Sequence, residues 1–405
     1  MKEKMKILIV NKFLYPNGGS ETYIFRLGEQ LTKMGHEVQY FGMEHEGRIV
    51  GNHAQSFTSN MDFHTGRLQK LLYPFKIIYS REARKKIRLV LDDFAPDVVH
   101  LNNFNFQLTP SVLYEIKKYR RAAGRRVKVV FTAHDSQLVC PNHLMQQYIS
   151  KERCTKCIGG SPWNCAKYKC IHGSFAKSLL GSMEAWVYRK LKAYRLIDVA
   201  ICPSRFLKEK LDTCPELHGK TVVMHNFVEP CREEKGERKK AQPYVLYFGR
   251  FSKEKGIETL LKVCRELSVI PFVFAGNGPL EEAVNQTQNV VNKGFMQGKE
   301  LTELIRNAAF SVFPSECNEN CPFSVMESLM YGTPVIGAKI GGVPELIQEG
   351  INGYLFESGN KKELSEKINY LWKESEELNR LTEGCAKTKF DTLEEYCEKI
   401  VQYYQ

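Results

Sequence analysis

Short apolar runs alternate with helical patterns along the first half of the chain. Tyr23, Leu27 and Leu31 recur at the spacing of one helix face and predict a helix over Thr22–Met34. The apolar runs have the length of buried strands. They are Lys6–Val10, Glu37–Phe41, Val98–Leu101, Val127–Ala133, Val199–Cys202 and Val222–Met224. Strands that alternate with helices predict a parallel sheet covered by helices on both faces.

A polar and highly charged segment, residues 229–242, interrupts this pattern and is predicted to link two domains. After it the alternation restarts. The predicted strands and helices are Tyr244–Phe248, Gly256–Leu267, Phe272–Ala275, Asn289–Lys293, Lys299–Ala308, Phe310–Phe313 and a helical run from Lys361 onward. The sequence therefore predicts an α/β protein with two Rossmann-like, doubly wound parallel sheets, over residues 1–228 and 243–385, that face a cleft. We expect residues 386–405 to form a helix that packs back on the first domain.

Two further helical stretches are predicted in the first half. Gly173–Lys192 is expected to bury an apolar face made of Leu179, Met183, Trp186, Val187 and Leu191. Residues 66–90 read as helical with a break at Pro74, and they run into a basic cluster. Apolar residues beside basic ones suit an anionic membrane surface. A core helix with a basic exposed face is the alternative, which the pattern favours slightly.

The most informative stretch is a pair of acids eight positions apart, Glu319 and Glu327. Pro322 marks the start of a helix between them, and Gly332 fits its left-handed end. Glu319 should therefore lie on a loop and Glu327 on the first turns of the helix. The free N–H groups of Ser324 and Val325, beside Phe323 at the helix start, suit an anion, and all three residues are candidates for binding the substrate. The alternative is that both acids only cap and solvate an ordinary helix.

Several other loops are expected at the carboxyl ends of strands, where ligands bind in such sheets. Arg250 and Lys255 follow one strand and can neutralise a pyrophosphate. Glycine turns let the backbone approach a ligand closely at Gly276-Asn277-Gly278, Gly341-Gly342 and Gly18-Gly19. His134 follows a strand and can orient a sugar hydroxyl or accept a proton, although a lone histidine there is more often structural.

Composition narrows the class of partner. The formal net charge of +12 and the pI near 9.0 favour an acidic partner such as a nucleotide, nucleic acid or anionic lipid. No apolar run approaches the roughly 20 residues needed to cross a bilayer. With thirteen cysteines and no recognisable export signal, we expect reduced thiols in the cytoplasm.

A cysteine-rich excursion, residues 140–172, interrupts the first domain. Two close cysteine pairs, Cys154 with Cys157 and Cys165 with Cys170, can form a four-thiolate structural zinc site. A redox pair, or packed thiols without metal, remains an alternative. Four thiolates leave no open position for a substrate, so a metal bound there would be structural.

Nearly the whole chain resembles the retaining glycosyltransferases of the GT-B fold, often called family 4, most strongly from Tyr244 to Leu355 and more loosely before it. The resemblance rests on five motifs: Gly249-Arg250 with Lys255-Gly256, Gly276-Asn277-Gly278, Glu319 through Glu327, Gly341-Gly342-Val343-Pro344-Glu345, and, more loosely, Gly18-Gly19 with His134. One departure from the family pattern is Pro322, where members often have glycine.

The resemblance implies a role for each matching residue. Glu319 would contact the transferred sugar and Glu327 the ribose hydroxyls. Arg250 and Lys255 would contact the diphosphate, and His134 would lie near the acceptor and the reacting sugar. The implied reaction is transfer of a hexose from a nucleotide diphosphate sugar to an acceptor hydroxyl with retention and without a metal or other cofactor.

The acceptor implied by the family is a glycan or lipid-linked glycan, in polysaccharide assembly at the inner membrane face. Two alternatives stay open. One is a GT-B nucleotide-sugar epimerase, and the other is a nucleotide- or polyanion-binding protein without catalysis. Nucleic acid is not expected, because the basic residues are not interleaved with aromatics in a known module.

Overall fold

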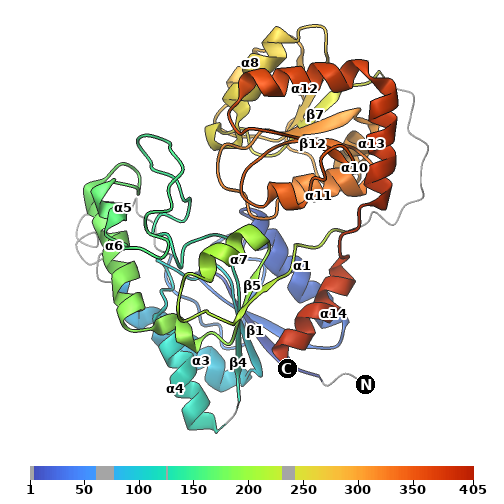
Figure 1. Cartoon of the computed structure of the whole chain (residues 1–405). Coiled ribbons are helices and arrows are strands. Elements are labelled where there is room, and N and C mark those ends of the chain that lie inside the picture. Colours follow the sequence, from blue (N-terminus) through green and yellow to red (C-terminus); the bar gives the residue numbers. More distant parts are fainter. Residues whose placement is uncertain (1–3, 61–76, 125, 230–241) are drawn as a thin grey trace. The chain divides into compact units, whose positions relative to one another are not determined.

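The computed structural model describes residues 4–60, 77–124, 126–229 and 242–405, which form two compact units (Figure 1). Unit 1 consists of Met1–Met224 together with Leu393–Gln405, and unit 2 consists of His225–Thr392. Most of the predicted linker, and residues 66–76 of the predicted basic helical stretch, lie outside the described residues. The chain thus leaves unit 1 at residue 224, forms all of unit 2, and returns to unit 1 for its last residues.

Unit 1 is built on a parallel sheet of six strands in the order β2-β1-β3-β4-β5-β6. The predicted strands are confirmed to within one residue at each end. They are β1 Lys6–Val10, β2 Glu37–Phe41, β3 Val98–Leu101, β4 Lys128–Thr132, β5 Val199–Cys202 and β6 Thr221–Val223. Strand β1 pairs on both sides, with Ile9 opposite Tyr40 of β2 and His100 of β3. The winding direction changes there, so β1 and β3 flank the crevice at which ligands bind in open sheets of this kind.

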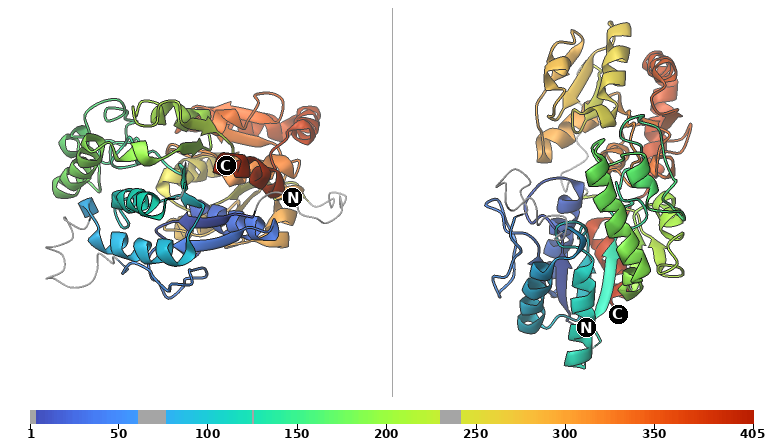
Figure 2. Two further views of the ribbon diagram at one scale, coloured as in Figure 1. Left: turned by 90° about the horizontal axis from the view of Figure 1, so that it is seen from below. Right: turned by 90° about the vertical axis from the view of Figure 1, so that its left-hand side faces the viewer.

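The helices of unit 1 begin where side chains satisfy their first free N–H groups. The hydroxyls of Ser80 and Ser204 accept hydrogen bonds from Ala83 N (3.0 Å) and Leu207 N (3.1 Å). Helices α3 and α4 pack together, as Figure 2 shows. The helices are α1 Gly19–Lys33, α3 Arg81–Phe94, α4 Ser111–Ala123, α5 Asn164–Lys167, α6 Phe175–Lys190, α7 Arg205–Leu211 and α14 Leu393–Tyr404, with a 3₁₀ turn η2 at Ala193–Leu196.

The predicted buried face of α6 is wrong. Trp186 is 42% exposed, and Leu191, just past the helix, is 57% exposed. The helix instead buries Glu184, Tyr188 and its small residues, which allow the cysteine-rich excursion to approach the helix backbone closely. A Cβ on Gly181 would lie 2.5 Å from a methyl carbon of Ile171. The Ser182 hydroxyl donates to Pro162 O (2.9 Å).

Unit 2 contains a second parallel sheet, in the order β12-β11-β10-β7-β8-β9. Both of its faces are buried: Val245 and Tyr247 of β7 belong to one apolar cluster, and Leu246 and Phe248 to the other. The strands are β7 Val245–Phe248, β8 Phe272–Ala275, β9 Val290–Asn292, β10 Phe310–Phe313, β11 Val335–Ala338 and β12 Gly353–Phe356. This strand order matches the dinucleotide-binding sheet, whose direction of winding changes between β7 and β10.

The helices of unit 2 flank this sheet. The helix predicted after Pro322 is confirmed as α11, and Gly332 after it has the expected positive φ of 78°. The elements are η3 Lys253–Lys255, α8 Ile257–Glu266, α9 Glu281–Asn285, α10 Gly298–Asn307, α11 Phe323–Met330, η4 Val343–Glu345, α12 Lys361–Lys373 and α13 Ser375–Lys387. The structure is therefore an α/β protein with two doubly wound parallel sheets, as predicted.

Helix α14 completes the core of unit 1. It lies along α1 and contacts β4 (Figure 1). Tyr396 and Tyr404 are buried, and their hydroxyls bond to Tyr23 OH and His100 Nδ1, each at 2.8 Å. The last residues of the chain thus supply partners for polar groups in the middle of unit 1.

Candidate functional site

The carboxyl edge of the unit 2 sheet brings together an acid and a base at the point where the winding changes. The loop after β7 carries Lys255, and the loop after β10 carries Glu319. Lys255 Nζ lies 2.5 Å from Glu319 Oε1, and the Ser315 hydroxyl donates to the same oxygen at 2.7 Å. The two side chains are only 31% and 12% exposed, so this pair is partly shielded from water. The charge of Glu319 helps to hold the pKa of Lys255 above its ordinary value, against the opposing effect of burial.

Two glycines hold the backbone of the Glu319 loop from both sides. Gly256 has a φ of 73°, and a Cβ there would lie 1.9 Å from Pro314 O. Gly341 has a φ of 57°, and a Cβ there would lie 1.9 Å from Glu319 O. Gly342 N also donates to Glu319 O (2.8 Å). These close approaches require glycine and fix the loop that carries the acid.

Glu327 is the fifth residue of α11, and its carboxyl, unlike that of Glu319, has no hydrogen bond or ion pair with the described residues. Burial, and to a smaller extent the charge of Glu229, raises the pKa of its carboxyl to about 7. The N–H groups of Ser324 and Val325, in the first turn of α11, have no acceptor among the described residues either. The predicted positions of both acids, on the loop and on the helix, are confirmed.

The other predicted residues of unit 2 lie on the neighbouring loops of the same edge. Arg250 lies two residues after β7, and its side chain is exposed. Phe251 N donates to Asn277 O (2.7 Å), which joins the loops after β7 and β8. Gly278 belongs to the second of these loops. Phe323 is half-buried, with its ring 5.9 Å from that of Phe227.

In unit 1, His134 follows β4 and is held by two neighbours. Its Nε2 donates to Asn102 Oδ1 (2.9 Å), and the Tyr23 ring lies edge-on at 5.0 Å. Burial lowers the pKa of His134 to about 4, so the imidazole is neutral near pH 7. Since an amide oxygen only accepts, Nε2 carries the proton and Nδ1 is an acceptor.

Gly18 and Gly19 lie exposed at the start of α1, after the neighbouring strand β1. The loops after β1 and β3 are joined by Asn103 N, which donates to Asn11 Oδ1 (3.0 Å). The predicted site residues other than the cysteines therefore fall into two groups. Gly18, Gly19 and His134 belong to unit 1. The remaining residues, which follow the strands of the second sheet, belong to unit 2.

Two functional partners were not predicted from the sequence. Ser315 orients Glu319, and Asn102 fixes the tautomer of His134. Both are polar residues within two positions of the end of a buried strand, which is the signal that points to this edge of a sheet.

The cysteine-rich excursion gathers the four predicted thiols and one more. Cys140, Cys154, Cys157, Cys165 and Cys170 line a void of about 10 Å³. Burial raises the pKa of Cys140 to about 12 and that of Cys157 to about 11, so both are thiols without a cation. Among the described residues, no three His, Cys, Asp or Glu side chains already surround a common point as metal ligands do. The zinc site stays a prediction.

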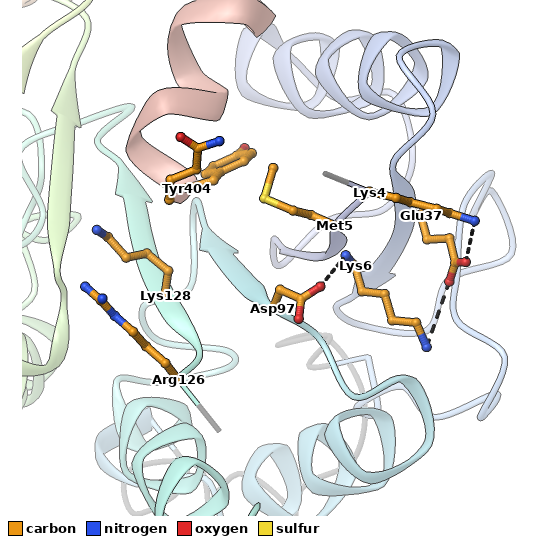
Figure 3. Close-up of a pocket in the computed structure, with 9 residues that line it drawn as sticks. Lys4, Met5, Lys6, Glu37, Asp97, Arg126, Lys128 and Tyr404 are labelled. Carbon is orange, nitrogen blue, oxygen red and sulfur yellow. Dashed lines mark hydrogen bonds and ion pairs between the residues drawn. The ribbon is translucent and has the colours of Figure 1, made fainter. Parts of the chain in front are cut away.

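A separate pocket of about 580 Å³ lies at the opposite, amino edge of the unit 1 sheet (Figure 3). Glu37 pairs there with Lys4 at 2.9 Å, and Asp97 accepts from Lys6 N at 2.8 Å. Arg126 and Lys128 also line it. None of the predicted site residues does, because those follow the carboxyl ends of the strands.

Two family models match the chain. The model described as Glycosyltransferase Family 4 matches residues 17–232, and the one described as Glycosyl transferases group 1 matches residues 231–388. Together they cover both units.

Individual relatives are distant. The chain is 28% identical over 204 residues to an uncharacterized glycosyltransferase of Methanocaldococcus jannaschii, and this match covers 49% of the chain and only 56% of that protein, about half its length. It is 25% identical to the O-antigen chain mannosyltransferase C of Escherichia coli, over 96% of this chain and 94% of that one. The Anabaena protein HepE, solved in complex with UDP, superimposes with a TM-score of 0.66 at 16% identity, over 98% of this chain and 99% of that one. This last likeness bears on the fold alone.

Proposed function

Because the chain belongs to glycosyltransferase family 4, we propose that it moves a sugar from a nucleotide diphosphate sugar to an acceptor hydroxyl in glycan assembly. One observation carries the proposal. At the winding change of unit 2, the Lys255–Glu319 pair lies on the same sheet edge as the unpaired carboxyl of Glu327 and the free N–H groups of α11. A cation, free amides and two differently paired acids suit a diphosphate that carries a sugar at one end and a nucleoside at the other.

We assign the roles as follows. Lys255 and Arg250 neutralise the diphosphate, and the free amides of Ser324 and Val325 bind its oxygens. As the anomeric bond breaks, negative charge grows on the leaving nucleoside diphosphate, where these donors stabilise it most. Glu327 accepts hydrogen bonds from the ribose hydroxyls.

Glu319 orients the sugar. In the absence of donor, Lys255 satisfies this carboxylate, so donor binding exchanges part of an internal ion pair for contacts with the diphosphate and the sugar hydroxyls. The cost of exposing either charge is limited, because each gains a new partner of the opposite polarity. The pair thereby keeps the site ordered until the donor arrives.

His134 acts in the acceptor half. Its neutral imidazole presents Nδ1 as an acceptor for a hydroxyl, since Nε2 is occupied by Asn102. We propose retention of configuration by a same-face mechanism in which the departing phosphate takes the acceptor's proton. The reaction then needs no metal, with the cations of unit 2 taking over the stabilisation of charge.

A panel of UDP-, GDP- and ADP-sugars tests the function. One nucleotide sugar should raise the melting temperature by linkage and be consumed when an oligosaccharide acceptor is added. NMR of the product's anomeric proton checks retention. A melting temperature unmoved by every nucleotide sugar at millimolar concentration contradicts the proposal.

We further propose that the acceptor is presented at an anionic membrane surface on the cytoplasmic side. No helix in the described parts of the chain is long and apolar enough to span a bilayer. Near α6, however, Trp163, Phe175 and Trp186 are 39%, 55% and 42% exposed, and the two indole rings lie 6.4 Å apart. Exposed aromatics beside lysines suit the interface of an anionic bilayer.

Vesicle sedimentation tests this contact. The chain should sediment with vesicles that contain phosphatidylglycerol, and less with phosphatidylcholine alone. Trp186→Ser should weaken sedimentation several-fold, whereas Phe295→Ser, at a 68% exposed aromatic in unit 2, should not. Equal sedimentation of the two variants contradicts the proposal.

A further inference from the structure

The cysteine-rich excursion lacks the kind of core that normally holds so long a loop in place. Within residues 140–172 the only helix is the four-residue α5, and the only bridge between extended residues joins Gln146 to Arg153. Long loops without secondary structure are uncommon in compact domains. Its buried centre is a small cluster of Cys157, Cys165 and Cys170, separate from the main core of unit 1.

We propose that the thiols of this excursion bind one Zn²⁺ ion, which holds the loop together. Five cysteines from separate turns of the loop converge on one void of about 10 Å³, and Asn142 and Gln146 complete its lining. They are Cys140, Cys154, Cys157, Cys165 and Cys170. Thiolates are the preferred ligands of structural zinc, and four of them fill its tetrahedral shell. Cys140 lies thirty residues before Cys170 in sequence and belongs to neither of the two close pairs. It is therefore a candidate ligand that the sequence pattern did not suggest.

Charge around the cluster favours this assignment. Zinc with four thiolates carries a net charge of −2, which is costly to bury without compensation. The Arg189 guanidinium donates to Cys157 O (3.1 Å), Gly160 O and Val139 O (both 2.8 Å), so a positive charge is fixed beside the void. Within the excursion, Glu152 is the only acidic residue against five basic ones. These are Lys151, Arg153, Lys156, Lys167 and Lys169.

The thiols would lose only weak hydrogen bonds on binding a metal ion. The Cys140 thiol donates to Asn142 Oδ1 (2.9 Å), the Cys157 thiol lies 3.9 Å from Pro162 O, and Cys165 is hydrogen-bonded to Cys170. Binding releases four thiol protons to solvent as four S–Zn bonds form, with no change of oxidation state. Binding requires rotation about the Cα–Cβ bonds, because among the described residues no three of these side chains are yet placed to hold a metal ion. All five cysteines are free, and joining them as disulfides would require an oxidant.

The test measures metal in the full chain, purified under reducing conditions, loaded with zinc chloride and desalted. We expect one zinc per chain in the wild type. The double variant C157S/C170S should hold less than a tenth of that. The matched control C202S/C264S, which removes two buried cysteines outside the cluster, should keep it.

Cobalt provides a second measurement on the wild type, which does not depend on whether a variant folds. Replacing zinc by Co²⁺ should produce the visible absorption of tetrahedral cobalt thiolate. Less than a tenth of a zinc per chain in the loaded wild type, or equal zinc in C157S/C170S and the control, would overturn the proposal. Neither readout requires glycosyl transfer. The result therefore tests zinc binding independently of the proposed function.

Discussion

Lys255 and Glu319 form the shortest link between the two loops that flank the winding change of unit 2, at 2.5 Å. Each is half-buried, so each depends on the other in the absence of a ligand. The same side chains are then the first to meet a diphosphate sugar. Their interaction is therefore expected to serve both the stability of the loops and the binding of the donor. A substitution that tests the second role needs a control for the first.

Lys255→Met should lower kcat/KM by about 100-fold or more, because it removes a cation from the leaving diphosphate. Lys253→Met is the matched control: Lys253 lies two residues earlier, is 64% exposed and pairs with Glu258 instead. It should change kcat/KM less than about twofold. Steady-state kinetics with the identified donor measure both, and equal losses would refute the role of Lys255.

The raised pKa of Glu327 predicts a pH effect on stability. The carboxyl titrates near pH 7 in the folded protein and near 4.5 in the unfolded chain, so the folded state binds its proton more tightly. The free energy of unfolding should therefore fall as pH rises from about 4.5 through 7. Melting temperatures of the wild type should decline over this range relative to Glu327→Gln. Parallel curves for the two proteins would mean that Glu327 is not the group responsible.

At the scale of elements, the site depends on glycines that press loops against each other. Gly341→Ala combines a positive φ with a Cβ 1.9 Å from Glu319 O, so the Glu319 loop has to move. Gly359→Ala is the control, since its φ is +80° but nothing lies within 4 Å of the added carbon. Gly359→Ala should cost about 1–2 kcal/mol. Gly341→Ala should lower the melting temperature further and also weaken donor binding, measured by calorimetry. Equal effects of the two substitutions would mean that the close approach of Gly341 to Glu319 O does not contribute to stability or donor binding.

Elements were predictable from the sequence where burial was complete. Strands such as β7 are apolar at every position because both of their faces are covered, and such runs are easily recognised. The face of α6 was mispredicted because hydrophobicity does not reveal where a neighbouring backbone comes close. Gly181 and Ser182 are buried there for their small size and hydrogen bonding.

The candidate site was predictable only in part, for a similar reason. The positions of Glu319 on the loop and of Glu327 on the helix follow from Pro322, a local signal. The pairing of Glu319 with Ser315 and of His134 with Asn102 depends on the tertiary approach of loops, which no local pattern encodes. Side-chain chemistry suggested a pyrophosphate for Arg250 and Lys255 and a sugar hydroxyl or a proton for His134, and the family resemblance assigned them to the donor diphosphate and the acceptor.

At the scale of the whole molecule, unit 1 is built from both ends of the chain. Removing Leu393–Gln405 would take the tyrosine partners from Tyr23 and His100, which are fully buried and would each keep only their hydrogen bond to Thr132 among those described. We expect the truncated chain to lose hydrogen-exchange protection in α1 and β4 while β7 and β10 of unit 2 keep theirs. Mass spectrometry of exchanged peptides measures this. Unchanged protection in α1 would show that unit 1 is complete without α14.

The return of α14 also fixes an order of events during synthesis. The whole of unit 2 is translated before the first residue of α14. Tyr23 and His100 therefore lack their tyrosine partners, Tyr396 and Tyr404, until α14 has been synthesised. A released chain that ends before Leu393 would contain all the residues of unit 2 but an incomplete unit 1, and the apolar surface that α14 normally covers is of the kind that chaperones recognise.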